Sequence, residues 1–546
     1  MKQNYKRVVF FFLFILTITV SSQNTVGILS NTANSLNGYT LFSSQKETYL
    51  INNCGEVVNQ WTSNFKGFNA YLLENGNLLR ASVIDNPGNI AIPGVAGRIE
   101  LFDWDSNLLW AYNFNTDTRI QHHDVFPMPN GNVLVLSAII LSDTEAIQMG
   151  RDPSKLNETQ LYTEQVIELE PIGTNDANTV WQWDIKDHII QDFDNTKDNF
   201  GIVGENQQLL DINYVGLSGG NANWLHINSM QYNAQLDQII LSTRHLSEIY
   251  IIDHSTTIAE ATSNTGGIYG KGGDFLYRWG NPLVYRQGTS FNQILDGQHF
   301  PHWIPEDYSD GGKIILFNNG FTRPSPGFSE VFILNPPVTS PGFYNYLANS
   351  AYGPNEPDYI YTAPIKTDFF SPILSSSQRL PNGNTFICEG TSGHFFEIDS
   401  NENIVWEYIN PISNTIILSQ GDDPKSVTNN VFRAYKYSAD YSAFDGKILT
   451  PGLPIELNPD LTQCAILSVA DVDFNELSLY PNPVENSLNI VSDDEVEKVE
   501  IYDVQGRKIN VENMKKNINF TTYSKGIYFL KVFTHSGVST KKVIKI

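Results

Sequence analysis

Cysteine and basic residues are the two main shortages of this 546-residue chain. Its three cysteines, Cys54, Cys388 and Cys464, allow at most one intrachain disulfide, and their spacing is not that of a metal site. We expect them to be buried or incidental. The chain has 34 Lys and Arg against 59 Asp and Glu, a net charge of −25. Sequence-independent binding to nucleic acid needs a basic face, so this class of function is excluded.

Long apolar runs are also missing after the first twenty residues. The one such run, residues 8–20, follows a basic stretch at 2–7 and ends in small polar residues at 21–23. It is shorter than the ~20 apolar residues that a membrane-spanning helix needs. This pattern favours a cleaved signal peptide over residues 1–22 rather than a membrane anchor. The sequence therefore predicts an exported protein without stable membrane insertion.

Helical periodicity of useful length is absent, and a two-part strand pattern recurs instead. In the first part, a turn rich in Asn, Asp and Gly leads into a strand. It occurs at residues 74–80, 129–137, 236–242, 311–317 and 381–388. In the second part, two strands flank a turn and the later strand ends in an aromatic residue. It ends at Trp61, Trp110, Trp181 to Trp183, Trp279, Tyr361 and Trp406. The Asn-Gly turns indicate hairpins.

Four short strands per repeat, with repeats of ~40–50 residues or more, are typical of a β-propeller. We therefore predict an all-β protein with a six-bladed β-propeller, its repeats running from about residue 38 to 410. The missing sixth turn strand should lie at residues 38–43, and closure of the ring would take a strand from residues 430–450. An array of β-sandwiches is the competing fold.

The pattern ends after residue 411, and a different module begins near 475. Strong alternation of apolar and polar residues predicts a small C-terminal β-sandwich there. The expected organisation is a signal peptide (1–22), a propeller domain (23–440), a linker (441–474) and a β-sandwich (475–546).

Three histidines provide the clearest functional signal. His123, His226 and His299 each open a segment that consists of a strand, a polar turn and a β-branched strand. If the repeats surround an axis, equivalent positions face one another across it. We therefore expect three imidazoles to meet in one pocket. The remaining histidines considered lack this regularity and are expected to be structural: His122, His245, His254, His302 and His394.

An arginine and an asparagine should join this pocket. Asn228 lies at the start of the same strand as His226, and Arg244 ends the next strand. Neighbouring antiparallel strands bring the start of one beside the end of the other. Arg244 should thus point to the same opening as His226.

Two chemistries suit such a cluster. Three imidazoles could hold Zn²⁺ with an open coordination position, as in a zinc hydrolase, but a nearby arginine would oppose the dication. An anion pocket fits better, since arginine offers a planar fork to tetrahedral oxyanions and Asn228 could donate one further hydrogen bond. Burial beside Arg244 would keep an imidazole unprotonated and able to act as a nucleophile.

Four motifs resemble those of the bacterial aryl-sulfate sulfotransferases. They are His-His-Asp (122–124), Trp-Leu-His-Ile-Asn-Ser (224–229), Ser-Thr-Arg-His (242–245) and Gly-Gln-His-Phe-Pro (297–301). The resemblance covers about residues 38–440. It implies transfer of a sulfuryl group from a phenolic sulfate ester to a phenol, by a ping-pong mechanism without nucleotide, metal or other cofactor.

The resemblance also implies roles for the individual residues. His299 would be the nucleophile that is transiently sulfated. The sulfate-binding positions would be His123, His226, Asn228 and Arg244. One of the two other imidazoles would act as acid or base, and the sequence leaves open which. Some members of the family carry a structural disulfide, for which this chain offers no convincing local pair. The alternative function is a non-catalytic surface propeller that binds a ligand or a protein partner.

The last ~70 residues resemble the sorting domain of the type IX secretion system of Bacteroidetes. The matching motifs are Tyr-Pro-Asn-Pro (480–483) and Lys-Gly-Ile-Tyr-Phe-Leu-Lys-Val (525–532). This resemblance implies the type IX secretion machinery as a partner. It also implies passage across the outer membrane, followed by release or attachment at the cell surface.

Overall fold

The computed structural model describes residues 24–462 apart from 87, 89 and 415, then Cys464, and then residues 478–546 apart from 493, 494, 505, 506, 514, 535 and 536. The expected signal peptide and the 465–474 part of the expected linker lie outside the described residues. The chain divides into two compact units between Cys464 and Ala465. The all-β prediction is confirmed: the described α-helices are α1 (Asp143–Gln148) and α2 (Ile258–Ala261). In this part of the chain, no helix has the length and apolar character needed to cross a membrane.

Six antiparallel sheets of four or five strands make up most of the first unit. The first three sheets, each from its inner to its outer strand, are β29 (Ala434–Ser438), β2 (Gly38–Ser44), β3 (Glu47–Asn52) and β4 (Val57–Thr62); β5 (Lys66–Leu72), β6 (Leu78–Val83), β7 (Gly97–Phe102) and β8 (Leu108–Asn113); and β9 (Arg119–Pro127), β10 (Val133–Ser142), β11 (Gln160–Ile172) and β12 (Asp176–Asp184).

The other three sheets follow the same plan. They are β15 (Ile227–Asn233), β16 (Gln238–Thr243), β17 (Glu248–Asp253) and β18 (Tyr277–Trp279); β19 (His299–Trp303), β20 (Ile314–Asn318), β21 (Glu330–Leu334) and β24 (Tyr359–Tyr361); and β25 (Ser376–Arg379), β26 (Thr385–Glu389), β27 (His394–Ile398), β28 (Ile404–Ile409) and β1 (Gly27–Asn31). Two short pairs lie in the connections: β13 (Ile189–Ile190) with β14 (Leu210–Asp211), and β22 (Val338–Ser340) with β23 (Phe343–Tyr344).

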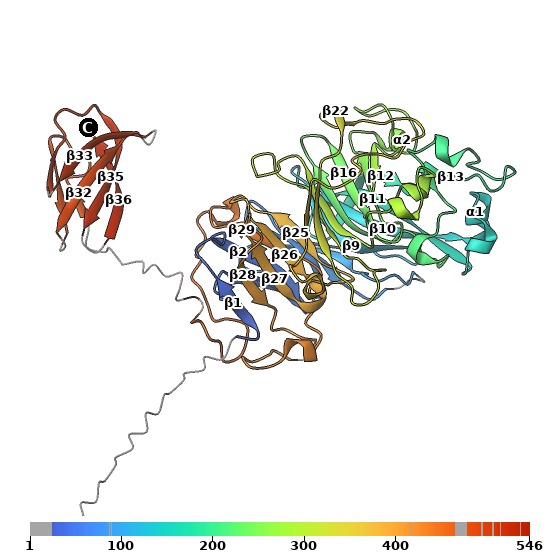
Figure 1. Ribbon diagram of the computed structural model, residues 1–546, viewed down its shortest axis with the longest axis horizontal. Coiled ribbons are helices and arrows are strands. Elements are labelled where there is room, and N and C mark those ends of the chain that lie inside the picture. The colour runs from blue at the N-terminus through green and yellow to red at the C-terminus, as the bar shows by residue number, and fades with distance from the viewer. Residues whose placement is uncertain are drawn as a thin grey trace, which may run out of the picture. The chain divides into compact units, whose positions relative to one another are not determined.

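The predicted repeat corresponds to this plan strand by strand. The five segments that begin with a polar turn contain the second strands β6, β10, β16, β20 and β26, and the aromatic-ended segments contain the fourth strands. A strand from residues 430–450 does pair with the N-terminal sheet, because β29 pairs with β2 in antiparallel register. At the other end of the unit, β1 pairs with β28 and extends the last sheet. Figure 1 shows blue β1 and β2 close to orange β28 and β29, so that the two ends of the unit meet.

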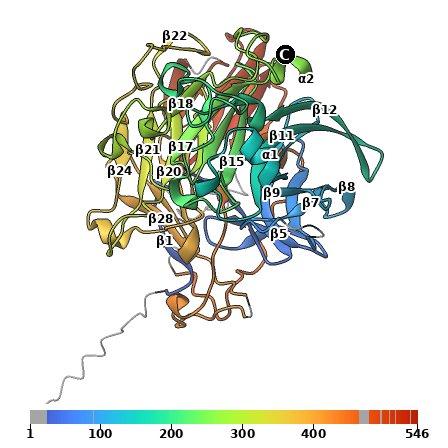
Figure 2. The same ribbon diagram turned by 90° about the vertical axis from the view of Figure 1, so that its right-hand side faces the viewer.

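The sheets contact one another in chain order. In the first sheet the second strand, β2, contacts β5, and from there the first-named strands contact one another in the order β5, β9, β15, β19 and β25. The strand β25 in turn contacts β29 of the first sheet. The ribbon colour accordingly changes from blue through green to yellow from one sheet to the next (Figure 2).

In five of the six sheets, a tryptophan near the end of the repeat forms a hydrogen bond to the next sheet. The indole of Trp61 in the first sheet donates a 2.8 Å hydrogen bond to the carbonyl of Asp103, between the third and fourth strands of the second sheet. Equivalent bonds leave four other sheets: Trp110 to Asp176, Trp183 to Gly273, Trp279 to Pro354 and Trp406 to Asn53. A buried indole adds a large apolar surface to one directional bond, so each such residue fixes its sheet against the next.

The first unit extends beyond the boundary expected at residue 440. Gly452 donates a 2.8 Å hydrogen bond to the carbonyl of Val57, and Cys464 forms a disulfide with Cys54 at a Cα–Cα distance of 5.5 Å. Residues 441–464, which we expected to belong to a linker, therefore pack on the first sheet. The expectation that Cys54 and Cys464 are incidental is wrong, because folding brings together cysteines that lie 410 residues apart. Cys388 is buried, as expected.

The second unit contains two sheets. One has the order β30 (Ser478–Tyr480), β31 (Ser487–Val491), β34 (Asn517–Asn519), and the other β33 (Lys508–Asn513), β32 (Val496–Tyr502), β35 (Gly526–Thr534), β36 (Gly537–Lys545). Buried side chains from both sheets, among them Leu488, Ile518, Val499 and Leu530, form one core. The alternating pattern that suggested this module arises because every second residue enters that core.

The disulfide should contribute measurably to the stability of the first unit. Reduction, or the substitution Cys54→Ser, is expected to lower the unfolding free energy by about 2–4 kcal/mol, since the crosslink restricts the unfolded chain. Thermal unfolding with and without dithiothreitol measures this effect. The reductant should not change the unfolding of the Cys54→Ser variant, which serves as the control. An unfolding midpoint of the wild type that is insensitive to complete reduction would contradict the expectation.

Candidate active site

Irregular pairing shapes the inner strands around the predicted pocket. The register shifts where β5, β9, β15 and β19 pair with the strand that follows each in the chain, so each carries a bulge. At these bulges His123, His226 and Phe300 adopt the left-handed region, with φ of 53°, 50° and 53°. Side chains other than glycine rarely adopt this conformation, and bulges next to functional sites redirect side chains. The bulges thus turn His123 and His226 away from regular strand positions.

The expected equivalence of the three histidines needs a correction. His123 and His226 occupy the same left-handed position in their repeats, but Phe300 holds that position in β19. His299 lies one residue earlier, where the third sheet has His122. The sequence repeat cannot reveal this one-residue offset, because the offset depends on the backbone conformation.

The structure nevertheless brings the three imidazoles and Arg244 together. The ring centroids of His123 and His226 are 4.8 Å apart, and His299 and Arg244 lie close enough to lower the pKa of both. All four side chains are buried. They come from three neighbouring sheets and form one buried cluster, which we call the histidine pocket.

Burial and neighbouring charges keep these imidazoles neutral. Loss of solvent is the largest cause and lowers the pKa of His123 and His226 well below the usual value; neighbouring histidines and Arg244 add to it. Burial, and then Arg244, lower the pKa of His299 to about 3. Each ring therefore has one unprotonated nitrogen at neutral pH.

Arg244 is the unusual charge in this group. Its guanidinium lies 4.2 Å from the ring centroid of Phe321, and no hydrogen-bond acceptor for it occurs among the described residues. Burial lowers its pKa to about 10, while Asp296 opposes that shift, so the side chain stays charged at neutral pH. A buried cation that lacks an acceptor creates a strong preference for an anion.

The tautomer of His299 follows from its neighbour Asn319. The amide nitrogen of Asn319 donates to the carbonyls of Ser371 and Leu374, at 2.7 and 3.0 Å. Its oxygen must then accept, and it lies 2.7 Å from Nδ1 of His299. Nδ1 of His299 therefore carries the proton, and Nε2 has the lone pair of a nucleophile.

His226 has the opposite arrangement. The side-chain amide of Asn223 donates to its Nδ1 at 2.9 Å, which leaves the proton on Nε2. His245 packs with its ring centroid 4.7 Å from that of His226 and donates from Nδ1 to the carbonyl of Asn223 at 2.8 Å. We had expected His245 to be structural only, yet it packs directly on a ring of the pocket.

Asn228 uses one N–H of its side-chain amide within the protein. Its amide donates at 2.7 Å to the carbonyl of Gln298, the residue before His299, and the side chain is fully buried. Gln298 in turn donates to the carbonyl of Glu248 at 2.8 Å. Asn228 therefore fixes the start of β19, and with it the position of His299.

Arg433 is a charged neighbour that the sequence analysis missed. It donates to Asp124, at 3.1 Å, and to the hydroxyls of Tyr71 and Tyr435, and it lies 4.0 Å from the ring centroid of Phe300. Its charge helps to lower the pKa of His123 and His299. The only available sequence signal was its place beside the predicted closing strand.

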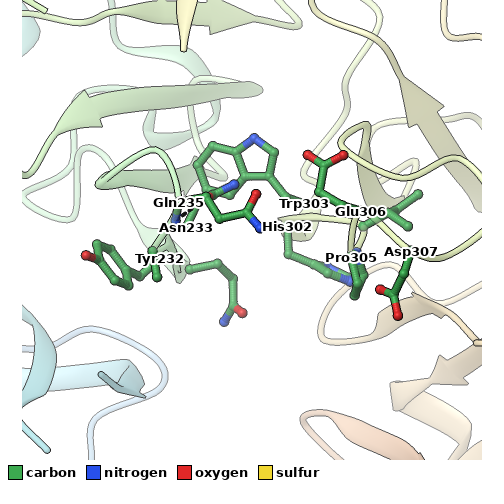
Figure 3. Close-up of a pocket in the computed structure, with 11 residues that line it drawn as sticks. Tyr232, Asn233, Gln235, His302, Trp303, Pro305, Glu306 and Asp307 are labelled. Carbon is green, nitrogen blue, oxygen red and sulfur yellow. Dashed lines mark hydrogen bonds between the residues drawn. The ribbon is translucent and has the colours of Figure 1, made fainter. Parts of the chain in front are cut away.

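His302, which we expect from the sequence to be structural, lies elsewhere. It lines a cavity of about 490 Å³ at the opposite ends of β15 and β19 from His226 and His299. Figure 3 shows Tyr232 and Asn233 on one side of this cavity and Pro305 and Asp307 on the other. The cavity is thus separate from the histidine pocket.

The described residues do not offer a set of ligands for a metal ion. Within the described ranges, no group of three or more His, Cys, Asp or Glu side chains is arranged to hold one. The hypothesis that the three histidines bind Zn²⁺ therefore has no geometric support, and the positive charge of Arg244 would repel the ion. What the pocket offers is a neutral nucleophile, a fixed N–H donor and an unpaired guanidinium, which together suit a tetrahedral oxyanion.

Comparison with known proteins gives the family. The family model described as Arylsulfotransferase (ASST) matches residues 23–417, and the chain belongs to this family. Residues 478–546 match the Secretion system C-terminal sorting domain.

Two curated relatives are arylsulfate sulfotransferases named AssT. The protein of Lelliottia amnigena is 27% identical over 186 residues, and that of Escherichia coli O6:H1 strain CFT073 is 27% identical over 188 residues. Each match covers 33% of this chain and 30% of the relative, so the matched region spans less than a third of those proteins.

Solved structures resemble the chain only weakly. A streptogramin B lyase aligns with a TM-score of 0.32 and 9% identity, over 72% of this chain and 86% of its own. A putative 6-phosphogluconolactonase of Bacteroides fragilis NCTC 9343 aligns with a TM-score of 0.35 and 11% identity, over 75% and 100%.

Removal of Arg244 should weaken anion binding without loss of stability. Hydrogen bonds to charged groups contribute about 1.5–3 kcal/mol, so Arg244→Met should bind inorganic sulfate about 10- to 100-fold more weakly. Its unfolding midpoint should stay the same or rise, because no protein acceptor loses a partner. Calorimetric titration with sulfate at constant ionic strength measures the binding. The control is Arg379→Met, since Arg379 pairs with Asp310 at 2.7 Å outside the pocket. Equal sulfate affinity of the two variants would contradict an anion site at Arg244.

Proposed function

We propose that the protein moves a sulfuryl group from a phenolic sulfate ester to a phenol by a ping-pong mechanism through sulfated His299. The observation that carries this proposal is the pairing of His299 with the oriented amide of Asn319, which leaves Nε2 unprotonated near the charge of Arg244. Membership of the arylsulfotransferase family supports the same chemistry.

In the first half-reaction, Arg244 and the Nε2–H of His226 hold the sulfate oxygens of the donor. Nε2 of His299 attacks sulfur, an N–S bond forms, and the S–O bond to the phenol breaks with its electron pair on oxygen. Donors fixed at the developing charge lower the barrier because they need no reorganisation during the reaction. The phenol leaves after taking up a proton, and an acceptor phenol reverses these steps.

We also propose the finer architecture. Six sheets that touch in sequence, with β25 against β29, support a six-bladed β-propeller for residues 23–440. Residues 441–464, which we call the strap, would pack on the first blade of the propeller. Two sheets around one core support a β-sandwich for residues 475–546.

The sorting domain supports export. We propose a signal peptide at residues 1–22, recognition of the C-terminal domain by the type IX secretion machinery, and a secreted or cell-surface protein. A phenolic sulfate and a phenol would be the small-molecule partners.

Mass spectrometry tests the nucleophile. Protein treated with 4-nitrophenyl sulfate should release a stoichiometric burst of nitrophenol and gain one sulfuryl group on the peptide that contains His299. His299→Ala should lose both signals, whereas His302→Ala, a histidine of the separate cavity, should keep them. A ligand-binding propeller without catalysis predicts no burst from any aryl sulfate. Sulfation at another residue would remove His299 from its role.

The pH dependence of the burst tests the environment of His299. With a pKa of about 3, the nucleophile stays unprotonated from pH 8 down to 5, so the burst rate should change little over this range. In Asn319→Asp, a carboxylate beside Nδ1 stabilises the imidazolium and raises the pKa. The burst of this variant should therefore decline at a higher pH than that of the wild type, and stopped-flow absorbance measures both profiles. An unchanged profile would show that Asn319 does not control the ring.

A further inference from the structure

A second buried imidazole stands behind His123. Nδ1 of His122 lies 2.9 Å from Nδ1 of His123, and Nε2 of His122 lies 2.8 Å from Oε2 of Glu164. The two atoms are close but not aligned as a hydrogen bond, and neither has a hydrogen-bond partner among the described residues. The other oxygen of Glu164 accepts a 3.0 Å hydrogen bond from the backbone of Ile227, next to His226. Glu164, His122 and His123 thus form a row that leads from a buried carboxylate to the pocket.

Only one proton can lie between the two facing Nδ1 atoms. If His123 holds it, Nε2 of His123 is a lone pair and can act as a base. If His122 holds it, His122 carries protons on both nitrogens beside the negative Glu164, and Nε2 of His123 can carry a proton for donation. The row therefore exists in two states that differ by one proton at the pocket end.

We propose that Glu164 and His122 form a proton relay that makes His123 the acid and base of the sulfuryl transfer. This inference rests on the proposed function and answers which imidazole serves the phenol oxygens. His122 and Glu164 touch no substrate, and act as positioning residues through His123.

The relay balances in both half-reactions. When the S–O bond of the donor breaks, the phenol oxygen takes the Nε2 proton of His123, and the proton between the rings moves from His122 to His123. When the acceptor phenol attacks sulfated His299, Nε2 of His123 takes the phenol proton, and the shared proton returns to His122. In the first half-reaction the electron pair of the broken S–O bond stays on the phenol oxygen. In the second, the acceptor oxygen uses the pair freed from its O–H bond to form the new S–O bond, and the N–S bond breaks with its electron pair on Nε2 of His299. No other reactant is needed.

The relay would supply the proton that buried His123 does not hold by itself. His123 faces His122, His226, His299, Arg244 and Arg433, and burial with these neighbours lowers its pKa well below the usual value. An isolated His123 would therefore not hold the proton that a departing phenolate needs. Glu164 places a carboxylate oxygen 2.8 Å from Nε2 of His122, on the side of that ring away from His123. The other pocket imidazoles lack such a carboxylate: His299 pairs with Asn319 and His226 with Asn223.

Leaving-group dependence tests the relay. Phenyl sulfate releases a basic phenolate that needs a proton, whereas 4-nitrophenyl sulfate releases a stable anion. General acid catalysis contributes typically ~10²–10⁴-fold, so Glu164→Gln should lower kcat/KM for phenyl sulfate about 100-fold and that for 4-nitrophenyl sulfate less than about fivefold. The variant keeps an oxygen for the backbone of Ile227. His122→Asn should give the same ratio, which provides a second measurement if one variant folds poorly.

Glu168→Gln is the matched control. Glu168 also lies on β11 and contacts Nε2 of a histidine, His254, at 3.0 Å, away from the pocket. Its loss should change stability but leave the ratio between the two donors as in the wild type. An equal fall for both donors in Glu164→Gln and His122→Asn, or no fall, would overturn the relay. A wild type that shows no nitrophenol burst would instead overturn the proposed function, so the two failures are distinguishable.

Discussion

The buried positive charge of Arg244 is the constraint on which the pocket depends. It has no acceptor in the described part of the chain, and it lies against three imidazoles that burial already holds neutral. A protonated imidazole would place a second cation beside it in a site with little water, which is costly. The charge therefore selects both the protonation state of the histidines and the sign of the ligand. An anion satisfies the guanidinium and leaves the lone pairs of the rings available.

His123, His226 and His299 differ in which ring nitrogen carries the proton, because each ring contacts a different partner outside the pocket. An amide oxygen makes His299 a lone-pair donor at Nε2, and an amide nitrogen makes His226 a proton donor there. A second imidazole gives His123 access to both states in the proposed relay. The sheets supply the pocket rings, but residues one layer further out decide what each ring can do. Asn319, Asn223 and His122 are thus as informative about the chemistry as the pocket histidines.

The sequence predicted the strand order well, because each repeat carries a turn, alternating strands and a terminal aromatic residue. The sequence also predicted that His226 and Arg244 lie close together, because antiparallel pairing brings the start of one strand beside the end of the next. It could not reveal the bulges, which depend on backbone conformation and place His299 one residue out of step with His123 and His226. Asn319, Arg433 and Cys464 were missed for another reason: their partners are distant in the chain, and no local pattern marks such contacts.

The disulfide joins Cys54 to Cys464, which is the last residue of the first unit. A protease that cuts the chain anywhere in residues 465–477 would leave Cys464 attached to Cys54. The strap 441–464 would then stay tethered to the first sheet at both ends, next to the closing strand β29. Removal of the C-terminal domain would therefore leave the crosslink between Cys54 and Cys464 intact.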